Sequence, residues 1–361
     1  MRYVISGGGT GGHIFPAIAI ADALKRRMPD TEILFIGAEG RMEMERVPKA
    51  GYKIEGLWIS GLTKDLSVIT LPFKLISSLR KAKKLLKSFH PDAVIGVGGF
   101  ASGPTLKAAN WLGIPTVIQE QNSYPGKTNR NVGQKAKAIC VAYHGLDRWF
   151  PNEKIHFTGN PLRGNINGHC DREESAAHFG LDPNRPVVLL VGGSQGALGI
   201  NKGISAQIEK FKGSETQLIW QTGKYYYDQA VKEVKENNLE DLVKPTVFIE
   251  RMDYAYSVAD VVISRAGAIS ISELALVQKP VIFVPLPTAA EDHQTKNALA
   301  LADRGAAVLV RDADCGSQGL LAVKEIFDSP QRAAQMSAAI AQMGVRGSAD
   351  KIVDQIETLL V

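Results

Sequence analysis

The chain has 361 residues, 45% of them hydrophobic and 22% charged, so it is long enough to form two α/β domains with separate cores. Its three cysteines (Cys140, Cys170, Cys315) lie far apart, so neither a disulfide framework nor a Cys-x-x-Cys metal site is indicated, and a reducing cytosol suits them. The net charge of +5 conceals an asymmetry, because residues 1–150 carry 21 Lys and Arg against 11 Asp and Glu, whereas residues 151–361 carry 21 against 26.

The basic first part favours an anionic partner, such as nucleic acid, an anionic membrane or a phosphorylated substrate. No apolar run approaches the roughly 18 residues of a membrane-spanning helix. The first five residues predict a strand and not a signal peptide. We therefore expect a soluble or peripheral protein.

Strand-like apolar runs alternate with helical patterns throughout, which predicts parallel β-α-β units. In the first part, strands are expected at residues 3–6, 33–37, 93–96, 116–119 and 138–141. The break at Gly159–Pro161 and the polar stretch 164–186 predict a domain boundary near residue 160. The second part opens with "VVLLVGG", and further strands are expected at 217–221, 246–249, 261–264, 281–284 and 307–310.

Four predicted strand-to-helix junctions are rich in small residues: "GGGTGGH" (7–13), "GVGGFASGP" (96–104), "GGSQGA" (192–197) and "SRAGAISISE" (264–273). Such a junction places the N-terminus of a helix at the carboxyl edge of a sheet, where backbone N–H groups and the helix dipole attract phosphate. A tight turn also uses glycine for conformational reasons alone. Four junctions in two lobes favour a phosphate-rich site over that simpler explanation.

The first junction also fits the dinucleotide fingerprint, with Gly7, Gly9 and Gly12 in the pattern G-x-G-x-x-G. Glu39 is available as the acid at the end of the second strand, but its distance from Gly12 is longer than usual. A single dinucleotide also leaves the glycine loop of the second lobe unused. An NAD-binding protein therefore remains an alternative.

His13 follows the last glycine of this junction, in the first turn of the expected helix. The positive end of the helix dipole favours the neutral imidazole, which can accept a proton near pH 7. The alternative is a histidine that only hydrogen-bonds a neighbouring carbonyl group.

Residues 64–90 contain seven Lys and Arg and one acid. The helical pattern there sets Leu75, Leu79, Ala82, Leu86 and Phe89 on one stripe and Arg80, Lys84 and Lys87 on a neighbouring one. The segment is either a sheet-covering helix with a solvated basic face or a contact with anionic lipid, with Leu66, Ile69, Leu71 and Phe73 as an apolar wedge. Nucleic acid is not expected as a partner, because stacking aromatic residues are not interleaved with the basic ones.

In the second part, Ser270 and Glu273 have the spacing of a capping box, although Glu273 could instead accept two ribose hydroxyls. The loop "PLPTAAEDHQTKNA" follows a buried strand and gathers polar residues that are suited to sugar hydroxyls. Asp312 and Asp314 form an Asp-x-Asp pair that we interpret as a turn, and the other histidines lack metal-ligand spacing, so no metal site is expected.

The last segment places Ile352, Val353, Ile356, Leu359 and Leu360 on one helical face, which must pack against one of the two lobes.

The order of "GGTGGH", "GVGGFASGP", "QEQN", "GNPLR", "GGSQGA", "SRAGAISISE" and "EDHQTKNA" resembles the bacterial MurG family of N-acetylglucosaminyltransferases in peptidoglycan synthesis. The resemblance runs from residue 3 to beyond residue 300. It implies an α/β fold of the GT-B type, with two Rossmann-like lobes, parallel sheets and a cleft between them. The acceptor and membrane-binding lobe would span residues 1–160 and be joined by a C-terminal helix at about 345–361, and residues 161–344 would form the donor lobe.

The resemblance also implies an inverting reaction with no cofactor and no active-site metal. The donor, UDP-N-acetylglucosamine (UDP-GlcNAc), would bind the second lobe. Glu273 would hold the ribose and the Ile249 backbone the uracil, with the diphosphate and sugar held by Arg163, Ser194, Gln195, Ala268, Ile269, Ser270, His293, Gln294 and Asn297. Some relatives carry glutamine in place of His293.

By the same resemblance, the first lobe would bind a polyprenyl-diphosphate-linked muramyl peptide, lipid I. Its acceptor residues would be Thr10, Gly11, Gly12, Gly98, Gly99, Ser102 and Asn122, and Phe100 stands where some relatives have tyrosine. His13 would take the proton from the attacking hydroxyl, and the enzyme would lie on the cytoplasmic face of the cell membrane. A GT-B transferase with a different lipid or small-molecule acceptor is the alternative within this class.

Overall fold

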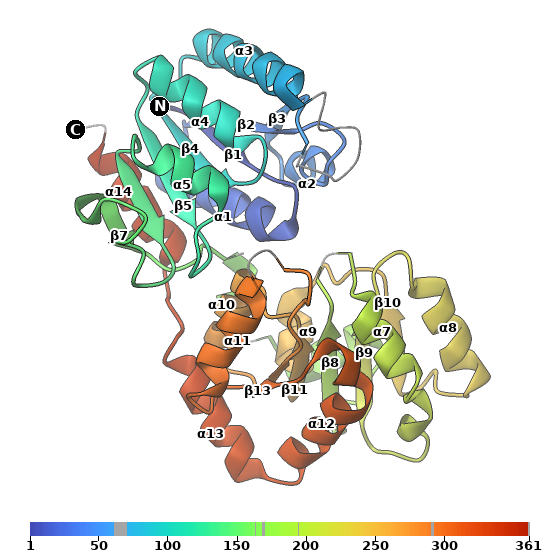
Figure 1. Ribbon diagram of the computed structural model, residues 1–361. Coiled ribbons are helices and arrows are strands. Elements are labelled where there is room, and N and C mark those ends of the chain that lie inside the picture. The colour runs from blue at the N-terminus through green and yellow to red at the C-terminus, as the bar shows by residue number, and fades with distance from the viewer. Residues whose placement is uncertain (61–70, 163, 168–169, 194, 290–291, 360–361) are drawn as a thin grey trace. The chain divides into compact units, whose positions relative to one another are not determined.

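The computed structural model describes residues 1–60, 71–162, 164–167, 170–193, 195–289 and 292–359. The chain divides into two compact units, one comprising Met1–Arg163 with Val345–Val361 and the other Gly164–Gly344. Each unit is a parallel sheet covered by helices (Figure 1), which confirms the expected α/β fold.

In its described part, the first unit has a seven-stranded parallel sheet in the order β3-β2-β1-β4-β5-β6-β7. Its strands are β1 (Arg2–Gly7), β2 (Glu32–Ala38), β3 (Lys53–Leu57), β4 (Ala93–Gly98), β5 (Thr116–Glu120), β6 (Ala138–Val141) and β7 (Ile155–Phe157). Its helices are α1 (Gly11–Arg27), α2 (Glu43–Lys49), α3 (Leu71–Phe89), α4 (Ser102–Trp111), α5 (Lys127–Gly133) and α14 (Ser348–Thr358).

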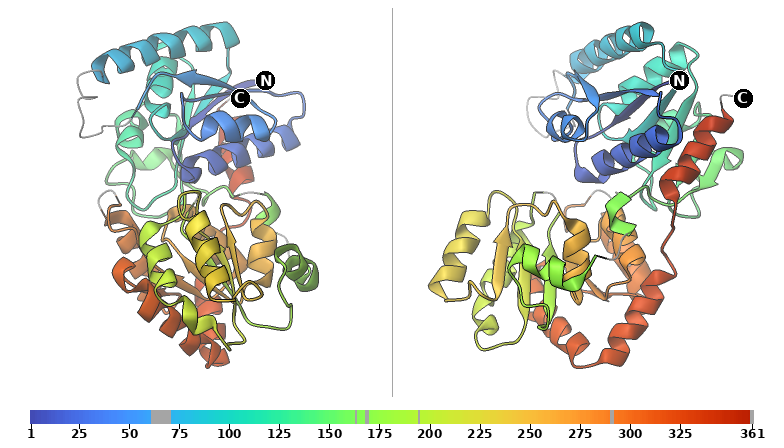
Figure 2. Two further views of the ribbon diagram at one scale, coloured as in Figure 1. Left: turned by 90° about the vertical axis from the view of Figure 1, so that its right-hand side faces the viewer. Right: turned by 180° about the vertical axis from the view of Figure 1, so that it is seen from behind.

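The two faces of this sheet bury separate cores, because successive side chains of a strand point to opposite faces. Tyr3 and Ile5 of β1 pack on the side of α1 and α14. Val4, between them, packs on the side of α3 and α4, where it joins Ala82 and Leu86. Figure 2 shows the helices that cover the two faces.

The C-terminal helix α14 belongs to the first unit, where it packs along α1. Ile352, Val353 and Ile356 are fully buried in the core shared with β1 and α1. Arg27 at the end of α1 pairs with Asp354 at 2.5 Å and with Glu357 at 2.6 Å. Of the expected apolar stripe, Leu359 also packs on this core, and Leu360 lies outside the described residues.

The second unit has, within its described residues, a six-stranded parallel sheet in the order β10-β9-β8-β11-β12-β13. Its strands are β8 (Val187–Val191), β9 (Gln217–Gln221), β10 (Val243–Thr246), β11 (Val261–Ser264), β12 (Val281–Phe283) and β13 (Val308–Leu309). Its helices are α6 (Arg172–Phe179), α7 (Leu198–Ser205), α8 (Tyr227–Glu236), α9 (Met252–Val258), α10 (Ala268–Val277), α11 (His293–Ala302), α12 (Leu320–Phe327) and α13 (Pro330–Ala341).

The strand expected at 246–249 lies earlier in the structure, at Val243–Thr246. Pro245 lies within it, and β10 is the edge strand of its sheet. An edge strand tolerates proline, because one side of it needs no ladder hydrogen bond.

No helix in the described residues has the length and apolar character needed to cross a membrane.

Candidate active site

In each unit the strand order reverses at one pair of neighbouring strands. The pair is β1 and β4 in the first unit and β8 and β11 in the second. Open α/β sheets bind ligands beyond the carboxyl ends of the strands at such a switch point. The loops after these four strands are the four glycine-containing junctions predicted from the sequence. Each unit therefore presents two of them where a ligand site is expected.

His13 lies at the switch point of the first unit, as the third residue of α1 after Thr10 at the N-cap position. Its Nδ1 is 3.1 Å from the carbonyl oxygen of Gly8 and 3.4 Å from Thr10 Oγ1. Because a carbonyl oxygen can only accept, Nδ1 carries the proton in this bond, and the lone pair of the neutral ring lies on Nε2. The side chain thus has the tautomer that a base acting through Nε2 requires.

The pKa of His13 lies below its ordinary value. Burial lowers this pKa, while the Gly8 carbonyl group and the charge of Glu43 act in the opposite direction. The imidazole is therefore neutral near pH 7 and able to accept a proton.

The loop after β4 meets the loop after β1 at this point. Gly98 and Gly99 have φ angles of +98° and +88°, which favour glycine. A Cβ on Gly98 would lie 2.9 Å from His13 Nε2, and a Cβ on Gly99 would lie 2.3 Å from the Gly8 oxygen. Glycine at both positions lets the two loops touch, so Nε2 of His13 faces the loop after β4. The structure brings the following predicted acceptor residues together here: Thr10, Gly11, Gly12, Gly98 and Gly99.

Ser102 does not fit the expectation of an acceptor contact through its side chain. The residue is fully buried in the first turn of α4, and its Oγ faces Gly96 of β4. Its buried Oγ makes no hydrogen bond within the described residues and is not presented to a ligand.

Asn122 is held by a buried carboxylate at the end of β5. Glu120 Oε1 accepts hydrogen bonds from the backbone N of Asn122 at 3.0 Å and from its Nδ2 at 3.2 Å. Glu120 Oε2 accepts from Gly126 N at 3.1 Å and from Asn129 Nδ2 at 2.8 Å. Burial raises the pKa of Glu120, and these four donors oppose the shift by stabilising the carboxylate. The predicted residue Asn122 therefore lies in a loop whose conformation Glu120 fixes.

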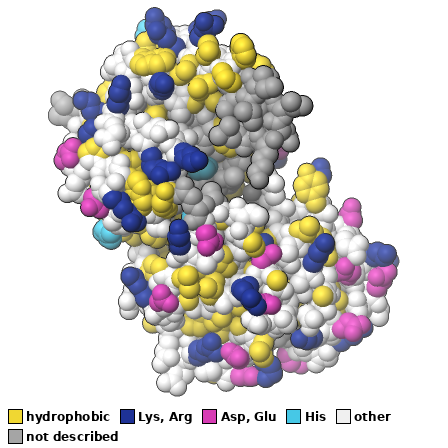
Figure 3. Space-filling view, in the orientation of Figure 1, with side chains coloured by type: hydrophobic (Ala, Val, Ile, Leu, Met, Phe, Trp, Pro, Cys, Tyr) yellow, Lys and Arg dark blue, Asp and Glu magenta, His cyan; other side chains and the backbone are white. Residues whose placement is uncertain are grey.

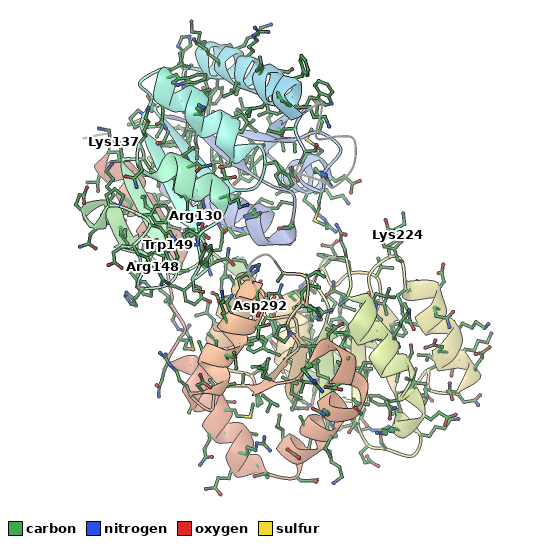
Figure 4. All side chains as sticks on the ribbon, viewed as in Figure 1. Arg130, Lys137, Arg148, Trp149, Lys224 and Asp292 are labelled. Carbon is green, nitrogen blue, oxygen red and sulfur yellow. The ribbon has the colours of Figure 1, made fainter. Side chains whose placement is uncertain are left out.

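Aromatic and basic side chains flank this loop. Tyr124 packs edge-on against Trp149, with ring centroids 4.9 Å apart, and accepts a hydrogen bond from Arg130 at 3.0 Å. Arg148 stacks on Trp149 at 3.9 Å. Figure 4 shows Arg130, Arg148 and Trp149 gathered beside α5. Two guanidinium groups at this edge of the sheet favour an anionic ligand.

In the second unit, the loop after β8 forms a closed turn. Gly196 N donates to Gly193 O at 2.9 Å, and Gln221 Nε2 of β9 donates to the same oxygen at 2.9 Å. Gln195 is exposed on this turn. Ser194 and Arg163, the other residues expected at the diphosphate, lie outside the described residues.

The loop after β11 leads into α10, which begins at Ala268 with Gly267 at the N-cap position. In this turn Ile271 N donates a helical hydrogen bond to Gly267 O at 3.0 Å. The N–H groups of Ile269 and Ser270 precede it, so they are directed out of the helix toward a potential phosphate.

Glu273 is not part of a capping box, because α10 begins two residues before Ser270 and Glu273 therefore lies in its second turn. Glu273 is 6% exposed, and its carboxylate accepts a hydrogen bond from Tyr256 Oη at 2.9 Å. The capping-box alternative for Glu273 is therefore wrong. Tyr256 of α9 orients the carboxylate instead.

The remaining predicted donor residues lie in two further segments. Ile249 lies between β10 and α9, and its side chain is buried. Its backbone is therefore the part of the residue that suits a ligand contact. His293, Gln294 and Asn297 lie on α11, whose N-terminal end is marked by Asp292 in Figure 4. Gln294 Oε1 accepts from Leu286 N at 3.0 Å, which ties α11 to the loop after β12.

Asp312 and Asp314 lie in a 3-10 helix and both form ion pairs. Asp312 pairs at 2.6 Å with Arg265, a buried residue that also donates to the carbonyl oxygens of Val284 and Pro285 at 3.0 Å. Asp314 pairs with Arg311 at 2.7 Å. Arg265 thus joins the loops after β11 and β12, a role that sequence reasoning missed.

Exposed apolar and basic side chains share the surface of α3. Phe73, Leu75 and Ile76 are 69%, 41% and 47% exposed, and Trp58 nearby is 50% exposed. Figure 3 shows Lys and Arg side chains gathered over this helix, beside hydrophobic ones. The basic residues that line a shallow depression on it are Arg80, Lys83, Lys84 and Lys87. On the predicted apolar stripe, Leu75 is thus exposed, whereas Ala82 and Leu86 are buried. Leu66, Ile69 and the side chain of Leu71 lie outside the described residues.

Known proteins resemble the chain along its whole length. The glycosyltransferase family 28 N-terminal domain model matches residues 3–141, and the C-terminal domain model matches residues 187–352. The UDP-N-acetylglucosamine–N-acetylmuramyl-(pentapeptide) pyrophosphoryl-undecaprenol N-acetylglucosamine transferase of Parabacteroides distasonis is 51% identical over 99% of this chain and 98% of its own. The enzyme of the same name from Porphyromonas gingivalis W83 is 53% identical over 100% of this chain and 96% of its own.

The crystal structure of Acinetobacter baumannii MurG superimposes with a TM-score of 0.74 at 28% identity, covering 99% of both chains. Its likeness extends over both parallel-sheet units and identifies the fold as GT-B. About half of the residues are identical to those of the two named enzymes over the full length, and both domain models match. The chain therefore belongs to the MurG family of N-acetylglucosaminyltransferases within glycosyltransferase family 28.

Proposed function

We propose that this protein transfers GlcNAc from UDP-GlcNAc to the 4-hydroxyl of the muramyl residue of lipid I, which forms lipid II for peptidoglycan synthesis. The observation that carries the proposal is the full-length identity of about one half to enzymes named for this transfer. The two switch points with helix N-termini suit a reaction in which both substrates carry diphosphates.

In this proposal the second unit binds the donor. The first turn of α10, with Ile269 and Ser270, binds the phosphates, together with Arg163, Ser194 and Gln195. Glu273, oriented by Tyr256, accepts the ribose hydroxyls. Backbone atoms of Ile249 hold the uracil, and residues of α11 hold the sugar. The N–H groups and the helix dipole stabilise the charge that develops on UDP as it leaves.

The first unit binds the acceptor diphosphate through the first turn of α1 and the loop after β4. His13 Nε2 takes the proton of the 4-hydroxyl while the hydroxyl oxygen attacks the anomeric carbon. The bond between that carbon and the phosphate oxygen breaks, and UDP leaves with the electron pair. Attack from the opposite face inverts the configuration of the sugar.

The exposed apolar residues and the basic residues of α3 suit a peripheral contact with an anionic membrane, from which the enzyme collects its lipid-linked acceptor. In this proposal the protein works on the cytoplasmic face of the cell membrane, where it meets its lipid-linked acceptor.

The transfer is tested with radiolabelled UDP-GlcNAc and two acceptors, a short-chain polyprenyl-diphosphate muramyl pentapeptide and a glycolipid without the muramyl group. We expect label in the muramyl acceptor alone. Label in the second acceptor alone would overturn the proposal. Glu273→Ala should weaken UDP-GlcNAc binding in calorimetry by about tenfold or more, since hydrogen bonds to a charged group are lost. Tyr256→Phe, which keeps the carboxylate, is the matched control and should have a smaller effect.

A further inference from the structure

Glu43 is a buried carboxylate next to the first glycine loop, and the proposed mechanism does not use it. It is the first residue of α2 and is 1% exposed. Its Oε1 accepts from Ala38 N at 2.9 Å, and its Oε2 accepts from Gly9 N at 2.8 Å. Burial of a carboxylate is costly unless such donors compensate it, so a purely apolar residue would be the simpler choice for this position.

The Gly9 N–H belongs to the same peptide group as the Gly8 carbonyl, which accepts the hydrogen bond from His13 Nδ1 at 3.1 Å. One peptide group therefore joins the carboxylate of Glu43 to the imidazole of His13. Hydrogen bonds in such a chain polarise one another, so a negative charge at the N–H end makes the carbonyl oxygen a better acceptor.

The packing leaves this peptide group little freedom. A Cβ on Gly8 would lie 2.2 Å from Glu43 Oε1, and a Cβ on Gly99 would lie 2.3 Å from the Gly8 oxygen. Glu43 thus contacts one side of the peptide, and the loop after β4 contacts the other. The orientation of the Gly8 carbonyl group, and with it that of the His13 ring, depends on both contacts.

We propose that Glu43 is a positioning residue for the transfer reaction, and that it acts on His13 through the Gly8–Gly9 peptide group. It holds the proton of the neutral ring on Nδ1 and stabilises the imidazolium that forms when Nε2 takes the proton of the acceptor hydroxyl. The proton stays on Nε2 until it passes to solvent, and Nδ1 keeps its own proton. A carboxylate that orients a catalytic imidazole directly is well known in enzymes, and here a peptide group stands between the two.

This inference rests on the proposed role of His13 as the base. Glu43 is the ionisable side chain in the described residues whose charge acts on the His13 pKa, and it raises that pKa. The facing loop after β4 presents Gly98, Gly99 and Phe100, which do not ionise. Removal of the charge should therefore lower the His13 pKa and weaken it as a base.

The test is Glu43→Gln, with Glu45→Gln as the matched control, because Glu45 is exposed on the same helix and its substitution changes the net charge equally. In Glu43→Gln we expect kcat to fall by about tenfold or more, as is typical when the partner that orients a catalytic or metal-bound histidine is lost. The acid limb of the pH profile of kcat/KM should move to lower pH, and KM for UDP-GlcNAc should stay unchanged. In the background of His13→Ala, the same substitution should lower kcat no further.

A lower melting temperature with an unshifted acid limb would overturn the proposal and leave Glu43 with a structural role. ¹⁵N NMR of the histidine rings, with His13 assigned through His13→Ala, reads the tautomer and the pKa without turnover. The wild-type ring should be protonated on Nδ1, and a ring protonated on Nε2 would overturn the proposal even if Glu43→Gln does not fold. Absence of GlcNAc transfer by the wild type would count against the proposed function and not against this NMR result.

Discussion

At the scale of single residues, the chemistry proposed for the first unit depends on the protonation state of His13. Burial lowers the pKa of this imidazole, and the Gly8 carbonyl group holds its proton on Nδ1. A base is active when it is unprotonated, so a lowered pKa keeps the enzyme active to lower pH. The rate should fall as the pH drops through that pKa.

His13→Ala should lower kcat by about 10²–10⁴-fold, the usual contribution of a general base. The dissociation constant of UDP-GlcNAc, measured by calorimetry, should not change, because we assign donor binding to the second unit. The acid limb of the kcat/KM profile should disappear together with the base. Unchanged turnover would remove His13 from the mechanism and leave it with a structural hydrogen bond.

The sequence predicted His13 and the glycine loops but not the residues that orient them. Glycine-rich junctions leave a local pattern, because a strand, a turn and a helix follow one another within a few residues. The contact between Glu43 and Gly9 joins residues 34 positions apart, and Tyr256 reaches Glu273 across 17 positions. Such partners leave no local pattern. The one available signal is an acid at the end of a buried strand, as in Glu120 after "TVIQ".

At the scale of elements, the accuracy of strand prediction follows the position of each strand in its sheet. The strands at Ala138–Val141, Gln217–Gln221 and Val261–Ser264 were predicted with correct bounds, and each lies between two neighbours. The missed strands β3 and β7, and the displaced β10, are edge strands. Strands buried on both faces have continuous apolar sequences, whereas edge strands such as "KIEGL" are short and polar.

The helix α3 combines exposed apolar side chains with a basic surface, which is the basis of a prediction for this element. Charge reversal of Arg80, Lys84 and Lys87 to Glu should lower the partition of the protein onto anionic vesicles by about 100-fold or more, since each basic residue contributes about 1 kcal/mol near such a surface. The measurement is co-sedimentation with vesicles of phosphatidylserine and phosphatidylcholine at low salt.

The control for α3 reverses three exposed lysines of the second unit, Lys224, Lys232 and Lys235, which alters the net charge equally. That control should bind the vesicles as the unaltered protein does. Equal binding by the α3 variant would instead make α3 a sheet-covering helix with a solvated basic face.

At the scale of the whole molecule, the chain forms two units with separate cores, and it returns to the first unit at its end. The periodicity of the last segment predicted a buried apolar face, but periodicity does not say which unit covers that face. The structure shows that α14 completes the core around β1 and α1, the two elements that carry the first glycine loop and His13. The stability of the first unit therefore depends on the last residues of the chain.

A chain that ends at Gly344 should have an unstable first unit and an intact second unit. Ile352, Val353 and Ile356 are fully buried, and burial of three such side chains contributes about 5–9 kcal/mol, which is comparable to the total stability of a domain at about 5–15 kcal/mol. We expect proteases to cleave the first unit rapidly, while UDP binding, measured by calorimetry, is retained. Arg27→Ala removes the ion pairs of Arg27 with Asp354 and Glu357 and its hydrogen bond to the Asp350 carbonyl oxygen, and it should cost no more than about 1 kcal/mol for each ion pair. A shortened chain with an unchanged melting temperature and full protease resistance would show that the first unit folds without α14.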